Sequence, residues 1–179
     1  SKKYKLENVE LQKHIWKYLR LRPGNFPTIR ISQLAAFLSK HPHVFDLFTS
    51  LNDSKVLKKQ LRIEPSIYWK SHYDFGKPSA RPLAGMGINS IENLLINTTV
   101  PLLAAYSQHI NEPKFLDKAL SILETLKPEK NKITRKWNEL AIPIDTAFDS
   151  QALIELHNNY CLKKKCLSCK IGVGLINRS

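Results

Sequence analysis

The sequence predicts an all-α fold: a compact multi-helix domain that ends in a short cysteine-rich loop. Three observations predict it. Apolar residues recur at helical spacing, no stretch alternates with period two for long enough to require a sheet, and prolines and glycines separate the segments. The length of 179 residues and the hydrophobic fraction of 42% suit one domain with its own core. We therefore expect residues 1–179 to form a single helical domain.

Two helices are predicted on either side of a proline-rich turn. An amphipathic helix is predicted over residues 9–19, with one apolar face formed by Leu11, Ile15, Tyr18 and Leu19. Two prolines and a glycine then force a turn over residues 21–27. A second helix is expected over residues 28–39. Its inward face is predicted to carry Ile31, Leu34, Ala35 and Leu38.

The middle of the chain predicts shorter helices. Residues 41–61 are expected to form one or two of them, the last capped by Ser54, with Asp53 and Asn52 as alternatives. Residues 65–73 predict another short helix.

A loop is predicted over residues 76–82, where two prolines and a glycine fall within seven residues, and it is the best internal boundary. A long helix should follow over residues 88–106, kinked or broken near Pro101. The remaining helices are expected over residues 113–126, over 128–140, and from a cap at Asp145 or Thr146 to about residue 160.

The chain is strongly basic, with 28 Lys and Arg against 15 Asp and Glu and a formal net charge of +13. A net charge of this size creates a positive electrostatic field that attracts polyanions, so nucleic acid is the first partner to expect. The alternatives are a merely solvated basic surface or an acidic partner domain. The apolar stretch over residues 94–105 is too interrupted to span a membrane, and the N-terminus lacks the features of a signal peptide. We expect a cytoplasmic protein with no membrane contact.

All three cysteines, Cys161, Cys166 and Cys169, lie within nine residues. A CxxC pair with a third thiolate nearby suits a metal ion, and His157, one helical turn before Cys161, is the candidate fourth ligand. The expected cofactor is zinc, with an iron–sulfur cluster as the alternative. The lysines at 163–165 favour thiolates, which would also make unliganded thiols reactive. The alternative is that the three cysteines are free thiols and bind no metal.

Arginines flank the proline-rich turn, and Phe26 stands at its tip. In a nucleic-acid complex, phosphates would be bound by Arg20, Arg22 and Arg30, and a base would stack on Phe26. Alternatively, Phe26 fills the core and the arginines pair with carboxylates.

A polar group around His72 is the one candidate for catalysis. His72 beside Asp74, with Trp69 and Tyr73 nearby, has the residue types of a general base site, although packing residues of this kind are common. No complete active site is apparent, so we do not expect this chain alone to be an enzyme.

Several further motifs are spread over nearly the whole chain: Arg20 to Arg30, Trp69 to Tyr73, Ile96 to Thr98, Asp149 to Gln151 and the terminal cysteines. Together they resemble a bacterial family catalogued only as a domain of unknown function. The resemblance implies that the chain is the C-terminal part of a longer protein, whose N-terminal region is then an expected partner. It implies no activity, because none is established for the family.

Residues 83–91 resemble the hairpin of the helix-hairpin-helix DNA glycosylases of the endonuclease III type. There, Gly85 and Gly87 would let backbone amides approach a DNA phosphate. The cysteine segment, residues 157–175, is similar to their cluster loop. Asn89 stands where their catalytic lysine would be, and Leu175 where their fourth cysteine would be. The resemblance therefore implies binding without cleavage and no four-cysteine cluster.

The sequence thus favours a nucleic-acid-binding helical domain with a structural metal site at its C-terminus. The alternatives are a protein-interaction or scaffold domain that serves the N-terminal region, and an enzyme with a site around His72.

Overall fold

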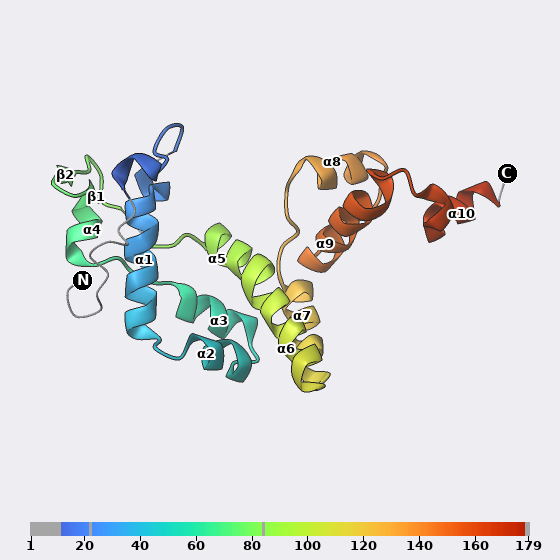
Figure 1. The fold of residues 1–179 in the computed structure, drawn as a ribbon, viewed down its shortest axis with the longest axis horizontal. Helices are drawn as coiled ribbons and strands as arrows, with labels where there is room; N and C mark the ends of the chain where they lie inside the picture. The colour runs from blue at the N-terminus through green and yellow to red at the C-terminus, as the bar shows by residue number, and fades with distance from the viewer. Residues whose placement is uncertain (1–11, 22, 84, 178–179) are drawn as a thin grey trace. The chain divides into compact units, whose positions relative to one another are not determined.

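The computed structural model describes residues 12–21, 23–83 and 85–177. Helices dominate this part of the chain, and its only sheet has two strands, so the prediction of an all-α fold is confirmed (Figure 1). The chain divides into two units, Ser1–Ser50 with Lys55–Ile91, and Leu51–Ser54 with Glu92–Ser179. The division falls inside a helix, whereas the sequence suggested residues 76–82 as the boundary. Among the described residues, no helix has the length and apolarity needed to cross a membrane.

In the first unit, helix α1 (Pro27–Lys40) follows the short turn η3 (Pro23–Asn25). Pro27 stands in its first turn, where a missing N–H group costs no helical hydrogen bond. The hydroxyl of Thr28 donates to the backbone oxygen of Tyr73 at 2.6 Å, which ties α1 to a segment 45 residues further along the chain.

The face of α1 that the sequence predicted to point inward is exposed. Ile31, Leu34 and Leu38 are 47%, 54% and 48% exposed, and Ala35 is exposed as well. The residues of α1 that are buried are Ile29, Ser32 and Gln33. Helical spacing identifies an apolar stripe but does not provide the neighbours that would cover it.

The helix predicted over residues 9–19 is wrong in its described part. Residues 9–11 lie outside the described residues, and from 12 to 19 only a single turn, η2 (Lys13–Ile15), is present. Leu19 is 84% exposed, and Ile15 is exposed too. A short helix gains little stability without burial of its apolar face, because nucleation is costly.

Three short helices and a hairpin follow α1 in the chain: α2 (Val44–Ser50), α3 (Ser54–Leu61), α4 (Ile67–Ser71), β1 (His72–Asp74) and β2 (Lys77–Pro78). Ser54, the predicted cap, is instead the first residue of α3. The helix predicted to residue 73 ends at Ser71, and the predicted loop contains β2. Gly76 has a φ of +65°, which permits the tight turn between the antiparallel strands.

The long helix predicted from residue 88 is present as three consecutive parts: α5 (Ile88–Leu94), the π-helical turn η4 (Leu95–Thr99) and α6 (Val100–Ile110). The N–H group of Val100 donates to the carbonyl oxygen of Leu95. The irregular turn lies directly before Pro101, where the sequence predicted a kink, because proline cannot donate to the helical ladder.

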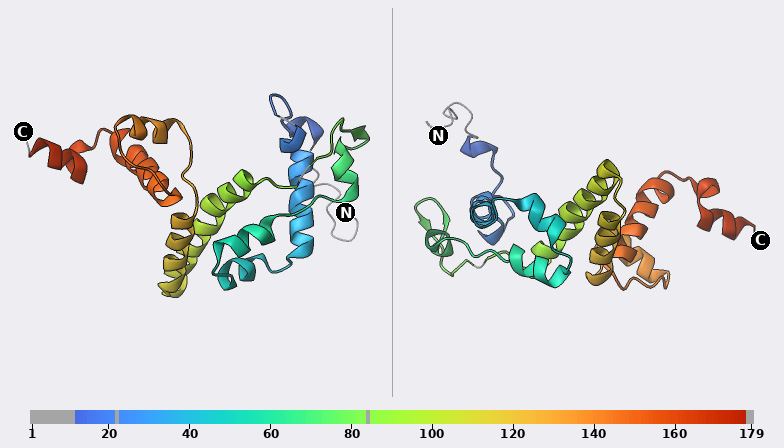
Figure 2. Two further views of the ribbon diagram at one scale, coloured as in Figure 1. Left: turned by 180° about the vertical axis from the view of Figure 1, so that it is seen from behind. Right: turned by 90° about the horizontal axis from the view of Figure 1, so that it is seen from below.

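The second unit is built on paired helices. Figures 1 and 2 show α6 beside α7 (Lys114–Thr125), and α9 (Ala147–Leu156) contacts both α7 and α8 (Lys132–Glu139). Thr146 caps α9, as predicted: its hydroxyl accepts from the N–H group of Asp149, whose carboxylate accepts from the Thr146 N–H group at 2.9 Å. Buried apolar residues of this unit include Leu95, Leu103, Ala119, Ile122, Leu123, Leu126 and Ala147.

The cysteine segment is helical over much of its length, although the sequence predicted a loop. It consists of the π-helical turn η5 (His157–Cys161), the 3-10 turn η6 (Cys166–Ser168) and helix α10 (Lys170–Ile176). Helix α10 lies against η6, and a Cβ at Gly172 would collide with the carbonyl oxygen of Cys166. The absence of a side chain at Gly172 therefore permits this packing.

Candidate nucleic-acid interface and cysteine segment

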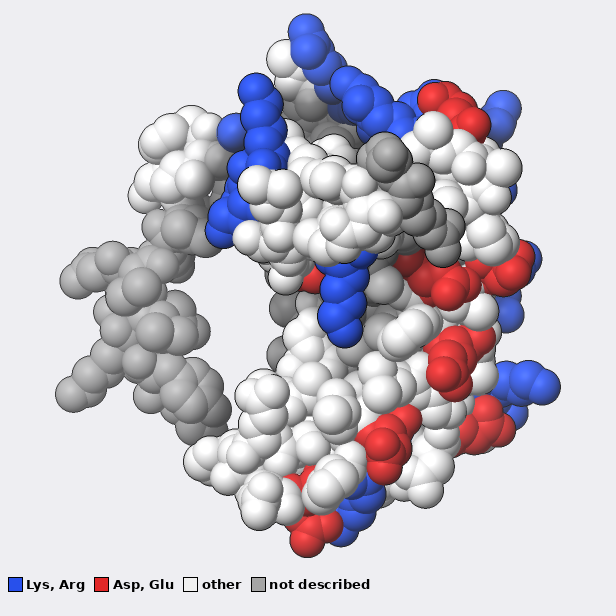
Figure 3. All heavy atoms as spheres, turned by 90° about the vertical axis from the view of Figure 1, so that its right-hand side faces the viewer, with Lys and Arg blue, Asp and Glu red and all other residues white. Residues whose placement is uncertain are grey.

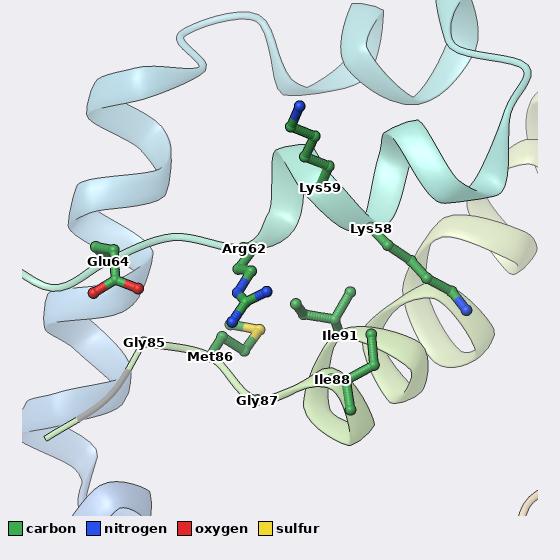
Figure 4. A pocket seen from close by; sticks show the side chains of 9 residues that line it. All are labelled: Lys58, Lys59, Arg62, Glu64, Gly85, Met86, Gly87, Ile88 and Ile91. Carbon is green, nitrogen blue, oxygen red and sulfur yellow. The ribbon is translucent and has the colours of Figure 1, made fainter.

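A pocket of about 490 Å³ lies in the first unit between the end of α3 and the loop that leads into α5 (Figure 4). The loop residues Gly85, Met86 and Gly87 form one wall. Gly85 is required there, because a Cβ would collide with the carbonyl oxygen of Ile63 and lie 3.2 Å from its carbonyl carbon. A Cβ at Gly87 would meet no described atom within 4 Å. The two predicted glycines therefore border one pocket, but only Gly85 is tightly packed.

Cations from α3 and the residues that follow it border the same pocket. Figure 4 shows Arg62 reaching toward Met86, Lys58 extending along the side of α5, and Lys59 pointing away. The carboxylate on this rim, Glu64, makes an ion pair with Lys70 at 3.4 Å. The pocket therefore combines a positively charged rim with a glycine-containing loop.

Sequence reasoning missed the cations of this pocket. Lys58 lies on α3 and Arg62 is the first residue after it. Two cations four residues apart were a signal available in the sequence, but only the fold brings both to the pocket that Gly85 and Gly87 also line.

Arg30 is held by neutral partners within the first unit. Its guanidinium donates to Asn25 Oδ1 at 2.7 Å, to Gln33 Oε1 at 3.1 Å and to Ser90 Oγ at 3.3 Å. The last of these bonds joins α1 to α5, just beyond the glycine loop. These acceptors orient the guanidinium without neutralising its charge.

Phe26 packs among aromatic rings and is half-buried. Its ring meets those of Tyr18 and Tyr73 edge to face, with centroid distances of 5.1 and 5.6 Å. This arrangement matches the packing alternative for Phe26. Arg20 is exposed at a φ of +63°, and Arg22 lies outside the described residues.

His72 and Asp74 make local contacts at the hairpin. The ring of His72 stacks on Tyr68 at 4.1 Å, and its Nδ1 lies 3.0 Å from Ser71 Oγ. Buried Asp74 accepts from the N–H group of Phe75 at 2.9 Å and pairs with Lys77 at 3.4 Å. These contacts stabilise the turn between β1 and β2.

The three cysteines border one small cavity in the second unit. Cys161 and Cys166 are exposed and Cys169 is buried, and all three line a cavity of about 230 Å³ whose other walls include Trp137. His157 does not line it, and its Nδ1 lies 3.2 Å from Asn158 Oδ1. Among the described residues, no three His, Cys, Asp or Glu side chains converge closely enough to hold a metal. The three thiols therefore border the same cavity without converging as metal ligands, and the predicted fourth ligand lies outside it.

Charged side chains project from the surface. On the face shown in Figure 3, Lys and Arg stand out in separate groups, with Asp and Glu and wide uncharged areas between them. In α7, partial burial lowers the pKa of Lys118.

The comparisons with known proteins identify a family and no function. A family model described as "Protein of unknown function (DUF2851)" matches residues 1–132. No curated protein matches the chain, and no solved structure matches it either. The chain therefore belongs to the DUF2851 family. The match includes the pocket between α3 and the glycine loop and ends before the cysteine segment.

Proposed function

We propose that this member of the DUF2851 family is a nucleic-acid-binding helical domain that holds a phosphate at the pocket between α3 and the glycine loop. The observation that carries the proposal is Arg62, whose guanidinium extends into the pocket opposite Gly85 and Gly87 (Figure 4). A guanidinium matches the geometry of phosphate oxygens and is always charged at neutral pH.

Two further observations support the proposal. The net charge of +13 increases the rate and the affinity with which any polyanion associates. The resemblance of residues 83–91 to the glycosylase hairpin, noted from the sequence, also favours a phosphate at the glycine loop, because glycine lets an anion approach the backbone closely. The binding site in this proposal is the pocket rim together with Gly85 and Gly87.

The experiment is a fluorescence anisotropy titration of a labelled 20-base-pair DNA duplex, repeated over a range of salt concentrations. Arg62→Gln is expected to weaken binding and to reduce the slope of log K against log salt by about 0.9, the effect of losing one phosphate contact. Lys136→Gln is the matched control, because Lys136 is exposed on α8 and loses the same charge. Equal losses in the two variants would mean that only the overall charge matters.

The proposal extends to the cysteine segment, where we expect a zinc ion to hold the last helix and its tail together. Its support is that Cys161, Cys166 and Cys169 border one cavity beside three lysines, which favour thiolates. A closed structural site needs a fourth ligand and a local approach of the thiolates. His157, on the turn that ends at Cys161, is the expected ligand.

Metal analysis with a visible spectrum tests this part on protein purified without oxygen. One colourless zinc per chain, lost in Cys166→Ser and reduced in His157→Ala, is the expected result. Iron with labile sulfide would indicate a cluster instead. Protein that carries no metal would leave three free thiols.

A second candidate function, a docking surface for the N-terminal region of a longer protein, is favoured by the exposed stripe of α1. Ile31, Leu34 and Leu38 lie on one side of the helix and are each about half exposed. Uncovered apolar stripes of this kind commonly mark interaction sites. Hydrogen exchange of α1 should be slower in the longer protein than in this chain. Identical exchange in the two would contradict a docked N-terminal region.

A further inference from the structure

We propose that the pocket between α3 and the glycine loop receives one unpaired nucleotide of a single strand, with its phosphate on Arg62 and its base on an apolar floor. This inference rests on the proposed function and adds the class of nucleic acid. A contact with a phosphate alone would not require the apolar floor of the pocket.

The floor is apolar and partly open to solvent. Ile91 lies at the bottom of the pocket and is 1% exposed, while Ile88, on the same side of α5, is 55% exposed. Met86 is half-buried beside them, and Figure 4 shows its side chain next to Arg62. An apolar floor beside a cationic rim suits a ligand that has an anionic end and a flat, weakly polar face. A nucleotide has both.

The dimensions of the pocket agree with such a ligand. Its volume of about 490 Å³ lies within the range of roughly 300–1,000 Å³ that small-molecule sites occupy. A phosphate alone would leave most of this volume empty. A base that lies on Ile88 and Met86 would cover apolar surface that is now exposed to water.

Base pairing decides which strands can use the floor. In a duplex, each base is stacked between its neighbours, so the double helix offers Arg62 only its phosphates. An unpaired nucleotide can turn its base away from the strand and place it against apolar side chains. The pocket is therefore expected to prefer single strands. Because its floor is aliphatic and offers few directional contacts, it should tolerate different bases.

The experiment compares a labelled 12-nucleotide single strand with the blunt duplex of the same length, by anisotropy at one low salt concentration. The unchanged protein should bind the single strand more tightly. Ile88→Ser should weaken binding to the single strand by about fivefold, the effect of losing the burial of roughly one methylene group, and should leave the duplex unaffected. Arg62→Gln should weaken both. Ile67→Ser is the matched control, because Ile67 is an exposed isoleucine of α4 outside the pocket.

The outcomes separate this inference from the function on which it rests. Equal affinity for both DNA forms, with no effect of Ile88→Ser, would overturn the single-strand inference and leave phosphate binding intact. Failure to bind either form would overturn both. An internal nucleotide and a 5′-phosphorylated end offer the same chemistry. The last measurement therefore uses a circular single strand, which has no ends. Undiminished binding of the circle assigns the pocket to internal nucleotides, and its loss assigns the pocket to strand ends.

Discussion

Gly172 and Gly174 both lie in α10, but only Gly172 faces the backbone of another segment. A Cβ at Gly172 would overlap the carbonyl oxygen of Cys166 and lie 3.0 Å from its carbonyl carbon. A Cβ at Gly174 would meet no described atom within 4 Å. Since the obstructing atoms belong to the main chain, Gly172→Ala must move α10 away from η6, whereas Gly174→Ala requires no movement.

The size of the effect follows from two opposing terms. Each substitution favours the helix by about 1 kcal/mol, because alanine has a higher helix propensity than glycine. Only Gly172→Ala adds the cost of overpacking, about 1–3 kcal/mol. The two variants should therefore differ by about 1–3 kcal/mol in the free energy of local opening of α10. That difference corresponds to roughly 5- to 150-fold in the opening equilibrium.

The buried thiol of Cys169, which precedes α10, reports this opening. In a background of Cys161→Ser and Cys166→Ser, the rate at which a thiol reagent labels Cys169 measures how often the segment opens. Labelling in Gly172→Ala should be faster than in Gly174→Ala by the factor above, and Gly174→Ala should label no faster than the parent. Equal rates in the two glycine variants would refute the packing of α10 on η6.

Two further predictions concern stability. Gly85→Ala should lower the Tm by about 2–4 °C for each kcal/mol of overpacking against Ile63. Gly87→Ala should lower the Tm far less, because a Cβ there meets no described atom. Equal Tm values for the two variants would contradict the tight contact at Gly85. The Asp149 carboxylate accepts hydrogen bonds from the Thr146 side chain and from the backbone of Thr146 and Asp145, and these bonds hold the pKa of Asp149 below its ordinary value. The ionised carboxylate therefore stabilises the fold above about pH 4, and this stabilisation is lost as the pH falls through the lowered pKa. Asp149→Asn keeps a side-chain acceptor but removes the charge, so it should reduce the free energy of unfolding at pH 7 by about 0.3–1 kcal/mol. Urea titrations should show this difference disappear in acid, and a constant difference would contradict the role of the charge.

Helices with their own start and stop signals were predictable from the sequence. Pro113 precedes α7, and Thr146 with Asp149 begins α9, because these residues satisfy or avoid the unpaired N–H groups of a first turn. An irregularity near Pro101 was also indicated, since a proline inside a helix removes a hydrogen bond from the ladder; the π-helical form of the turn was not. Signals of this kind act over a few residues, so a single sequence contains them.

Features that depend on residues distant in the sequence were decided only by the tertiary structure. The sequence indicates that Ile31 and Leu34 share a face of α1, but whether neighbours cover that face depends on the rest of the chain. The close approach of Gly85 to Ile63 and the bond from Arg30 to Ser90 join segments more than 20 residues apart. Local patterns thus determined most of the helices. Burial and the composition of the pocket required the packed chain, because both arise from contacts that no local pattern encodes.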